Sequence, residues 1–299
     1  MRTAVTISTE EKRRMNLSEM IRAGAERLKN ADIDDSDFDA RQLAQHVLSP
    51  LYPNGFDAKS LILFQDMTVD NGYAEKYFDV VNERANNKPL QYILGDWDFM
   101  GLTFNVGEGV LIPRPETETL AEIALDFLKG KENPIVFDLC SGSGCIAICI
   151  AKLCPSANVY AVEKSDIAFG YLNENISLNK ADNVHAVKGD IFDKNVLSGI
   201  VPDLIVSNPP YIRSDDIGSL QTEVQREPAM ALDGGEDGYD FYRVIASDWI
   251  KSIKKGGMIA VECAEDQTEY IEKLFSKTAS EVKAYNDLFG LPRGVTAII

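Results

Sequence analysis

The sequence predicts an α/β protein with a doubly wound, mostly parallel seven-stranded sheet, preceded by a small all-helical N-terminal domain and a linking β-hairpin. Three observations lead to this prediction. After about residue 130, short apolar runs alternate with amphipathic stretches of helical period, which is typical of parallel βαβ units. A glycine-rich loop follows the first of these apolar runs. The first ninety residues, by contrast, show helical periodicity joined by polar turns.

The length and charge of the chain limit its organisation and its partners. With 299 residues it is long enough for two domains. Acidic residues (47) outnumber lysine and arginine (30), which gives a net charge of −17. Binding to nucleic acid through the phosphates needs clustered basic residues. We therefore expect a protein partner and no direct nucleic-acid binding.

The chain contains no feature that predicts a membrane protein or a secreted protein. No apolar stretch approaches the ~20 residues that cross a bilayer. A charged run at residues 10–14 interrupts any signal-peptide core. These patterns predict a cytoplasmic protein with no membrane partner.

The patterning divides the chain into three parts. Residues 1–90 form the helical domain, with helices predicted at 17–29, 36–48 and 73–87. Residues 91–114 alternate aromatic and β-branched side chains with glycine, which predicts the hairpin linker. Residues 115–299 form the α/β domain, which opens with a helix from 116 to about 128.

Within the α/β domain, strands and helices alternate along the chain. Strands are predicted at 134–139, 158–163, 184–189, 203–207, 257–263, 281–286 and 295–299. Helices are predicted at 144–153, 166–179, 239–253 and 266–276. In such sheets ligands bind at the carboxyl ends of the strands, so the residues that follow each strand are the candidate functional residues.

The cysteines do not predict a metal site. There are five, with no Cys-x-x-Cys pair, and the only histidines, His46 and His185, are distant in sequence from the cluster at 140–154. This spacing does not match zinc ligation. We interpret the cysteines as reduced, mostly buried side chains.

The first predicted strand runs into the loop Cys140-Ser141-Gly142-Ser143-Gly144, and a helix follows. Glycines there let a cofactor approach the backbone, and the helix offers free N–H groups. Glu163 ends the second strand about 20 residues further on, where an acid can accept hydrogen bonds from ribose hydroxyls. The loop alone fits a nicotinamide dinucleotide as well as S-adenosylmethionine.

The third strand is followed by Asp190, Ile191 and Phe192. Asp190 is placed to accept a hydrogen bond from an adenine amino group, while Ile191 or Phe192 packs on the ring. The alternative interpretation of Asp190 is a turn or helix-cap residue, a role that aspartate often has.

The fourth strand ends in Asn208-Pro209-Pro210-Tyr211. Neither proline has an N–H and both have a fixed φ, so the segment is stiff and cannot continue the sheet. The Asn208 side-chain carbonyl and the Pro209 backbone carbonyl remain as acceptors, which suits an –NH2 group with two protons to donate. Methyl transfer to a planar nitrogen explains such an amide clamp, whereas a nicotinamide enzyme has no use for it.

Together these motifs resemble the HemK-type protein-(glutamine-N5) methyltransferases, which act on peptide chain release factors. The similarity runs from about Ala23 to the C-terminus. It is carried by the glycine loop, by Asn208–Tyr211, and by the segments 89–95, 111–118, 227–238 and 287–293.

The resemblance implies a class I methyltransferase-like fold, S-adenosylmethionine as methyl donor, and the glutamine of the release factors' Gly-Gly-Gln motif as acceptor. It also implies that the N-terminal domain helps to dock the release factor. By position, the cofactor would contact Cys140, Ser141, Gly142, Ser143, Gly144, Glu163, Asp190, Ile191 and Asn208. The substrate amide would be held by Asn208, Pro209, Pro210 and Tyr211.

The chain departs from the family pattern at two cofactor positions. Cys140 stands where the family usually has glycine, and Glu163 where it usually has aspartate. For Arg114, Glu116 and Thr117 two interpretations stay open, namely a border of the cofactor or substrate channel and a loop-to-helix cap.

Other functions are compatible with parts of the pattern. The Asn-Pro-Pro-Tyr motif also occurs in methyltransferases that act on exocyclic base nitrogens of nucleic acid, and in a glutamine methyltransferase of a ribosomal protein. A non-catalytic cofactor-sensing or interaction module would keep the fold, and a nicotinamide dehydrogenase would share the glycine loop.

Overall fold

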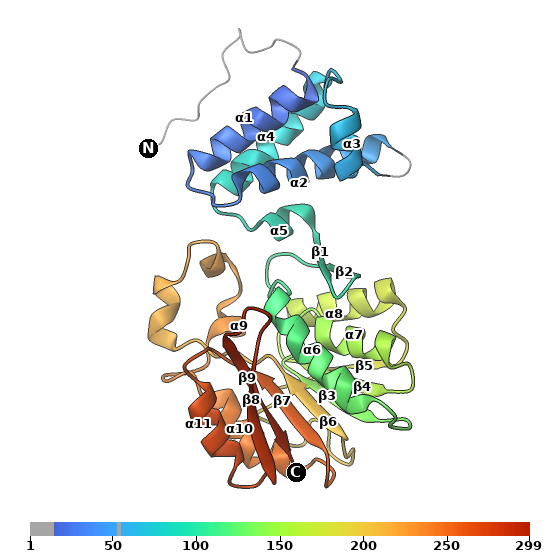
Figure 1. Cartoon of the computed structure of the whole chain (residues 1–299), viewed down its shortest axis with the longest axis vertical. Coiled ribbons are helices and arrows are strands. Elements are labelled where there is room, and N and C mark those ends of the chain that lie inside the picture. The colour runs from blue at the N-terminus through green and yellow to red at the C-terminus, as the bar shows by residue number, and fades with distance from the viewer. Residues whose placement is uncertain (1–14, 53–54) are drawn as a thin grey trace. The chain divides into compact units, whose positions relative to one another are not determined.

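The computed structural model describes residues 15–52 and 55–299, which form two compact units that meet between Leu94 and Gly95 (Figure 1). The charged run at residues 10–14 lies outside the described residues. No helix among the described residues is long and apolar enough to cross a membrane.

The first unit consists of helices, as predicted. Its α-helices are α1 (Leu17–Lys29), α2 (Ser36–Leu48), α3 (Ala58–Leu63), α4 (Asn71–Ala85) and α5 (Leu90–Leu94), with the 3-10 turn η1 (Ser49–Leu51). Asn16 and Glu19 form a capping box at the start of α1. A buried ion pair between Arg84 and Asp39, at 2.6 Å, joins α4 to α2.

The β-hairpin is shorter than predicted and packs within the second unit. Strands β1 (Asp96–Phe99) and β2 (Leu102–Asn105) are antiparallel, and the two turn residues between them have positive φ. Phe99 and Phe104 are buried in the core of this unit. Tyr92, which we expected in the hairpin region, lies instead in α5, where its N–H donates to the Pro89 carbonyl at 3.1 Å.

The seven predicted strands all form and make one sheet. They are β3 (Ile135–Leu139), β4 (Asn158–Glu163), β5 (Val184–Lys188), β6 (Leu204–Ser207), β7 (Met258–Glu262), β8 (Glu281–Asn286) and β9 (Pro292–Ile298). Their order is β5-β4-β3-β6-β7-β9-β8. Only β9 runs antiparallel to its neighbours, β7 and β8. The doubly wound, mostly parallel fold class is thus confirmed.

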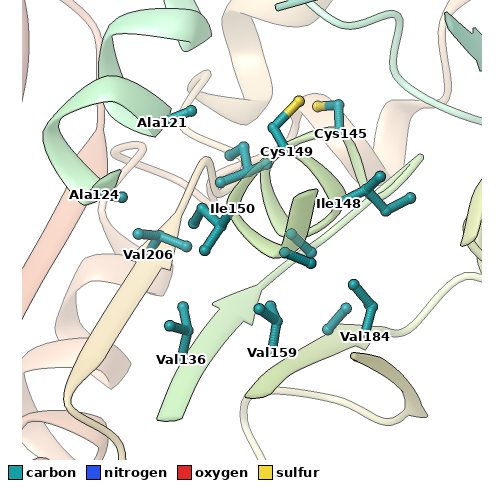
Figure 2. Packing of buried hydrophobic residues seen from close by; sticks show 14 of the residues in the cluster. Ala121, Ala124, Val136, Cys145, Ile148, Cys149, Ile150, Val159, Val184 and Val206 are labelled. Carbon is teal, nitrogen blue, oxygen red and sulfur yellow. The ribbon is translucent and has the colours of Figure 1, made fainter. Parts of the chain in front are cut away.

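Helices cover both faces of the sheet (Figure 1). On one face lie α6 (Pro115–Leu128), α7 (Cys145–Leu153) and α8 (Asp166–Asn179). Val136, Val159 and Val206 point to this face and pack under α7 and α6 (Figure 2).

On the other face lie α10 (Asp240–Ser247), α11 (Thr268–Phe275) and the 3-10 turn η4 (Trp249–Lys251). Successive side chains of a strand point to opposite faces of the sheet. Phe137, next to Val136, and Ile205, next to Val206, therefore point to this second face. The predicted helix 239–253 is interrupted after Ser247. The tight turn η4 buries Trp249, whose indole N–H donates to the Ile191 carbonyl at 2.9 Å.

Three further short elements lie between β6 and α10. They are η2 (Ser214–Ser219), η3 (Val224–Arg226) and α9 (Ala229–Leu232), none of which the sequence pattern predicted. All five cysteines are free thiols. Cys145 and Cys149 are buried on α7 (Figure 2).

We predict that the packing of α7 on the sheet is a main source of stability. Ile148→Ala, at a fully buried position of α7, should lower the free energy of unfolding by about 2–5 kcal/mol. Leu153→Ala, on the same helix but largely exposed, should change it by less than about 0.5 kcal/mol. Urea denaturation followed by circular dichroism measures both, and equal losses would contradict the assigned packing.

Candidate active site

A cavity of the second unit lies at the carboxyl edge of the sheet, where the strand order reverses between β3 and β6. Nine of the predicted site residues line it: Cys140, Ser141, Gly142, Ser143, Glu163, Asp190, Ile191, Asn208 and Pro210. Gly144, Pro209 and Tyr211 do not. Of the three residues left open, Arg114 and Thr117 line the cavity, and Glu116 does not.

The glycine loop is a series of left-handed turns between β3 and α7. Cys140, Gly142 and Gly144 have φ of +63°, +57° and +82°. A side chain in this conformation costs roughly 1–2 kcal/mol, so Cys140 introduces strain that glycine would avoid. Ser141 anchors the loop, because its hydroxyl donates to the Asp138 carbonyl at 2.8 Å and its N–H donates to the Val162 carbonyl at 3.0 Å.

The Glu163 carboxylate links the glycine loop to the end of β4. It accepts one hydrogen bond from the Gly142 N–H at 2.8 Å and another from the Ser165 N–H at 2.6 Å. Each carboxylate oxygen has a second lone pair, so the side chain can still accept bonds from a ligand in the cavity. Glu163 thus fixes the loop and remains an acceptor.

Asp138, inside β3, is a candidate functional residue that our sequence analysis missed. It is fully buried, and one carboxylate oxygen accepts a hydrogen bond from the Ala147 N–H at 3.2 Å. Its other oxygen has no hydrogen-bond partner among the described residues. Burial raises the pKa of Asp138 to about 7. The sequence did contain a signal for this residue, because Asp138 is the one acidic residue in the otherwise apolar strand Ile135–Leu139.

Asp190 is held by a turn and by an ion pair. Its carboxylate accepts from the Phe192 N–H at 3.0 Å and contacts the Lys164 ammonium at 2.8 Å. Burial alone would raise the pKa of Asp190, but Lys164 and the Phe192 N–H hold it below its usual value. Phe192 also packs edge-on against Phe241, with ring centroids 5.2 Å apart, and both line the cavity.

The Asn-Pro-Pro-Tyr segment brings an oriented amide to the cavity. The Asn208 Nδ2 group donates to the Thr117 hydroxyl at 3.1 Å. Gly234 packs directly against the backbone of this segment. A Cβ on Gly234 would lie 2.8 Å from the Tyr211 Cα, so only glycine fits at this position. Gln267 donates to the Tyr211 carbonyl at 2.9 Å.

The loop 109–114 forms another wall of the cavity. Arg114 makes an ion pair with Glu227, and the second carboxylate oxygen of Glu227 accepts from the Ile112 N–H at 3.1 Å. Glu227 is buried. This ion pair therefore fixes the loop that precedes α6 and, with it, the position of Thr117.

Known proteins match both units of the chain. Residues 19–95 match the PrmC N-terminal domain family, and residues 120–227 match the TRM5/TYW2 methyltransferase domain family. A release factor glutamine methyltransferase of Clostridium botulinum is 36% identical over 95% of this chain and 99% of its own length. One of Geobacter sulfurreducens is 43% identical over 67% of this chain and 69% of its own. The chain belongs to the release factor glutamine methyltransferase family.

Family membership confirms the resemblance seen in the motifs and makes the protein an S-adenosylmethionine-dependent methyltransferase. Among solved structures, the hMettl16 catalytic domain in complex with an RNA hairpin has a TM-score of 0.56. It is 13% identical, and the match covers 84% of this chain and 89% of that one. At this identity the likeness concerns the fold alone.

The cavity residues fit a cofactor of this kind. Glu163 offers acceptors for ribose hydroxyls, and the Phe192–Phe241 pair offers an apolar wall for an adenine ring. The unpartnered Asp138 oxygen lies in the strand that leads into the loop. Acidic groups around the cavity suit a ligand that carries positive charge. The contact residues themselves are a prediction.

We predict that Glu163→Gln weakens S-adenosylmethionine binding at least about tenfold, because hydrogen bonds to a charged acceptor are worth about 1.5–3 kcal/mol. Glu132→Gln, which removes the same charge from an exposed turn, should leave the affinity unchanged. Isothermal titration calorimetry measures both. If the two variants bound S-adenosylmethionine equally well, the role of Glu163 would be limited to its hydrogen bonds with the Gly142 and Ser165 N–H groups.

Proposed function

We propose that the protein transfers a methyl group from S-adenosylmethionine to the side-chain amide nitrogen of the glutamine in the Gly-Gly-Gln motif of peptide chain release factors. The orientation of Asn208 carries the proposal. Its Nδ2 group is bonded to Thr117, which leaves the carbonyl end as the acceptor on a residue that lines the cavity. The names of the relatives support the choice of substrate.

The chemistry requires a weak nucleophile to be held in line with a methyl group. S-adenosylmethionine, when bound, supplies that group on a positively charged sulfur, which makes the methyl carbon electrophilic. The lone pair of a carboxamide nitrogen is delocalised into its carbonyl. If the Asn208 and Pro209 carbonyls accept the two amide protons, electron density on the nitrogen rises and the nitrogen is positioned for attack.

No general base is needed before the new bond forms. The nitrogen gains a carbon–nitrogen bond as the carbon–sulfur bond breaks, and it then carries one proton too many. That proton leaves an acidified nitrogen towards water. The predicted site is consistent with this order, because neither histidine of the chain lines the cavity.

Tyr211 completes the predicted clamp by packing on the flat amide of the substrate. The structure shows the tyrosine half-buried, with burial raising the pKa of its hydroxyl. The phenol therefore stays neutral at physiological pH. A neutral aromatic face is the property that packing on an amide requires.

We further propose that the helical first unit helps to dock the release factor, and that the protein acts in the cytoplasm, where release factors work. The match of residues 19–95 to the PrmC N-terminal domain family supports the first of these.

We predict that wild-type protein adds one methyl group to the Gly-Gly-Gln glutamine of a purified release factor, and that Asn208→Ala lowers the rate about 100-fold or more by analogy with the loss of other preorganised groups. Labelled S-adenosylmethionine measures the rate, and mass spectrometry locates the methyl group.

A release factor with alanine in place of that glutamine is the matched acceptor control and should gain no label. Calorimetry with S-adenosylmethionine establishes that each protein variant still binds the cofactor. Cofactor binding without transfer would overturn the release-factor assignment. If nuclease treatment removed the label and protease treatment did not, the substrate of the enzyme would be a nucleic acid.

A further inference from the structure

Glu262 is a buried acid beside the clamp. It ends β7, where Val261 pairs with Ser207 of β6, so Glu262 and Asn208 occupy the next positions of neighbouring parallel strands. On its other side it pairs with Gly294 of β9. Its side chain is almost completely buried, and its Oε2 atom has no hydrogen-bond partner among the described residues.

Thr117 connects this acid to the clamp. Its hydroxyl accepts a hydrogen bond from Asn208 Nδ2 at 3.1 Å, so its single proton is free to be donated elsewhere. The buried hydroxyl and the Asn208 side chain both interact with the Glu262 carboxylate. Thr117 therefore accepts from the amide on one side, and its remaining proton is available to the Glu262 carboxylate, whose pKa it lowers.

Among the described residues, no salt bridge pairs a cation with the Glu262 carboxylate. Arg293, on β9, interacts electrostatically with Glu262, but its Nε and one terminal nitrogen both donate to the Asp287 carboxylate, at 3.2 and 3.1 Å. The ion pair with Asp287 holds the guanidinium in place. The Glu262 charge acts on the polar hydrogens of Thr117 and Asn208 as well as on Arg293.

A side-chain amide has two ends of similar size and opposite polarity, so its orientation must be specified. A clamp that accepts amide protons works only with the carbonyl towards the substrate. An ionised carboxylate and a hydroxyl acceptor behind the amide both attract its NH2 end. If Glu262 were protonated, it would offer a donor as well, and that preference would weaken.

We propose that Glu262 and Thr117 form a positioning pair, which holds the Asn208 amide with its NH2 group inward and its carbonyl towards the substrate nitrogen. This inference rests on the proposed amide methylation. Neither residue of the pair needs to touch the reacting atoms. Thr117 acts on Asn208 directly, and Glu262 acts through Thr117 and Asn208.

The positioning pair gives the reaction a pH dependence with a defined sign. Burial raises the pKa of Glu262 to about 7, while Thr117 and Arg293 lower it and Glu116 raises it. The ionised form is the one that orients Asn208, so kcat should fall as pH decreases from 8 to 6.

The phenols, thiols and Arg293 that interact with Glu262 do not titrate in this range. Burial raises the pKa of the phenols and thiols among them, namely Tyr211, Tyr242, Tyr285, Cys263 and Cys145. Burial lowers the pKa of Arg293, but Asp287, Tyr211 and Glu262 together raise it above its usual value. Asp138 does titrate near pH 7 on the cofactor side, so a comparison of variants is needed.

The test is the pH profile of Glu262→Gln. We expect kcat at pH 8 to fall about 10- to 100-fold, as for a misplaced reacting group, and the decrease of wild-type activity between pH 8 and 6 to be lost or reduced. The KM for S-adenosylmethionine should stay within about threefold, because Glu262 does not line the cavity. Glu265→Gln, an exposed change of the same charge three residues away, is the control.

Stability separates positioning from a structural role. The folded-state pKa of Glu262 lies above that of an unfolded glutamate, so its ionisation destabilises the fold as pH rises towards 7 and above. Glu262→Gln should consequently melt at pH 8 at a temperature equal to or above that of the wild type. Lower kcat with undiminished melting temperature supports positioning, and unchanged kcat overturns it.

Thr117 provides an independent second test. Thr117→Val keeps the shape and removes the hydroxyl, whereas Thr117→Ser keeps the hydroxyl and removes a methyl group. We expect kcat of the serine variant to exceed that of the valine variant at least tenfold, with similar S-adenosylmethionine binding. Equal kcat in the two variants would refute the pair. Failure of the wild type to methylate the release factor would instead refute the proposed function.

Discussion

The parallel pairing of β3 with β6 is the interaction on which the site depends. Leu139 pairs with Ser207 at the ends of these strands, and the buried Ser207 hydroxyl donates to the Leu139 carbonyl at 2.6 Å. The glycine loop begins one residue later at Cys140, and the clamp begins one residue later at Asn208. Neighbouring strands lie about 4.8 Å apart, so this single register places the predicted cofactor loop beside the proposed amide clamp.

Asp138 and Glu262, both close to this pairing, are buried acids whose ionisation is unfavourable. Burial raises the pKa of both Asp138 and Glu262 to about 7, well above that of either residue in an unfolded chain. The stability that their protonated forms provide is present below about pH 4 and is lost as pH rises through 7. Buried acids that reduce stability in this way are typical of functional sites, where a protein loses some stability in exchange for a defined electrostatic environment.

The sequence predicted the strands and the residues that follow them, because the alternation of apolar runs is local and the carboxyl edge follows from the parallel topology. It did not predict α5 or the interruption at Trp249, where tertiary packing decides the local conformation. Asp138, Glu262 and the bond between Asn208 and Thr117 were missed for a related reason. Their roles depend on strand register and on contacts between distant segments, which local patterns do not encode.

An amide clamp oriented in this way also explains how glutamine would be distinguished from glutamate. In the proposed clamp, the Asn208 and Pro209 carbonyls offer acceptors only. A substrate carboxylate would therefore find no donor there, and its charge would be opposed by the acids around the cavity. Sites that leave polar groups unpaired discriminate strongly, by factors of about 10⁴ or more. Because the inward NH2 group is what leaves only acceptors facing the substrate, the orientation of Asn208 would determine specificity as well as rate.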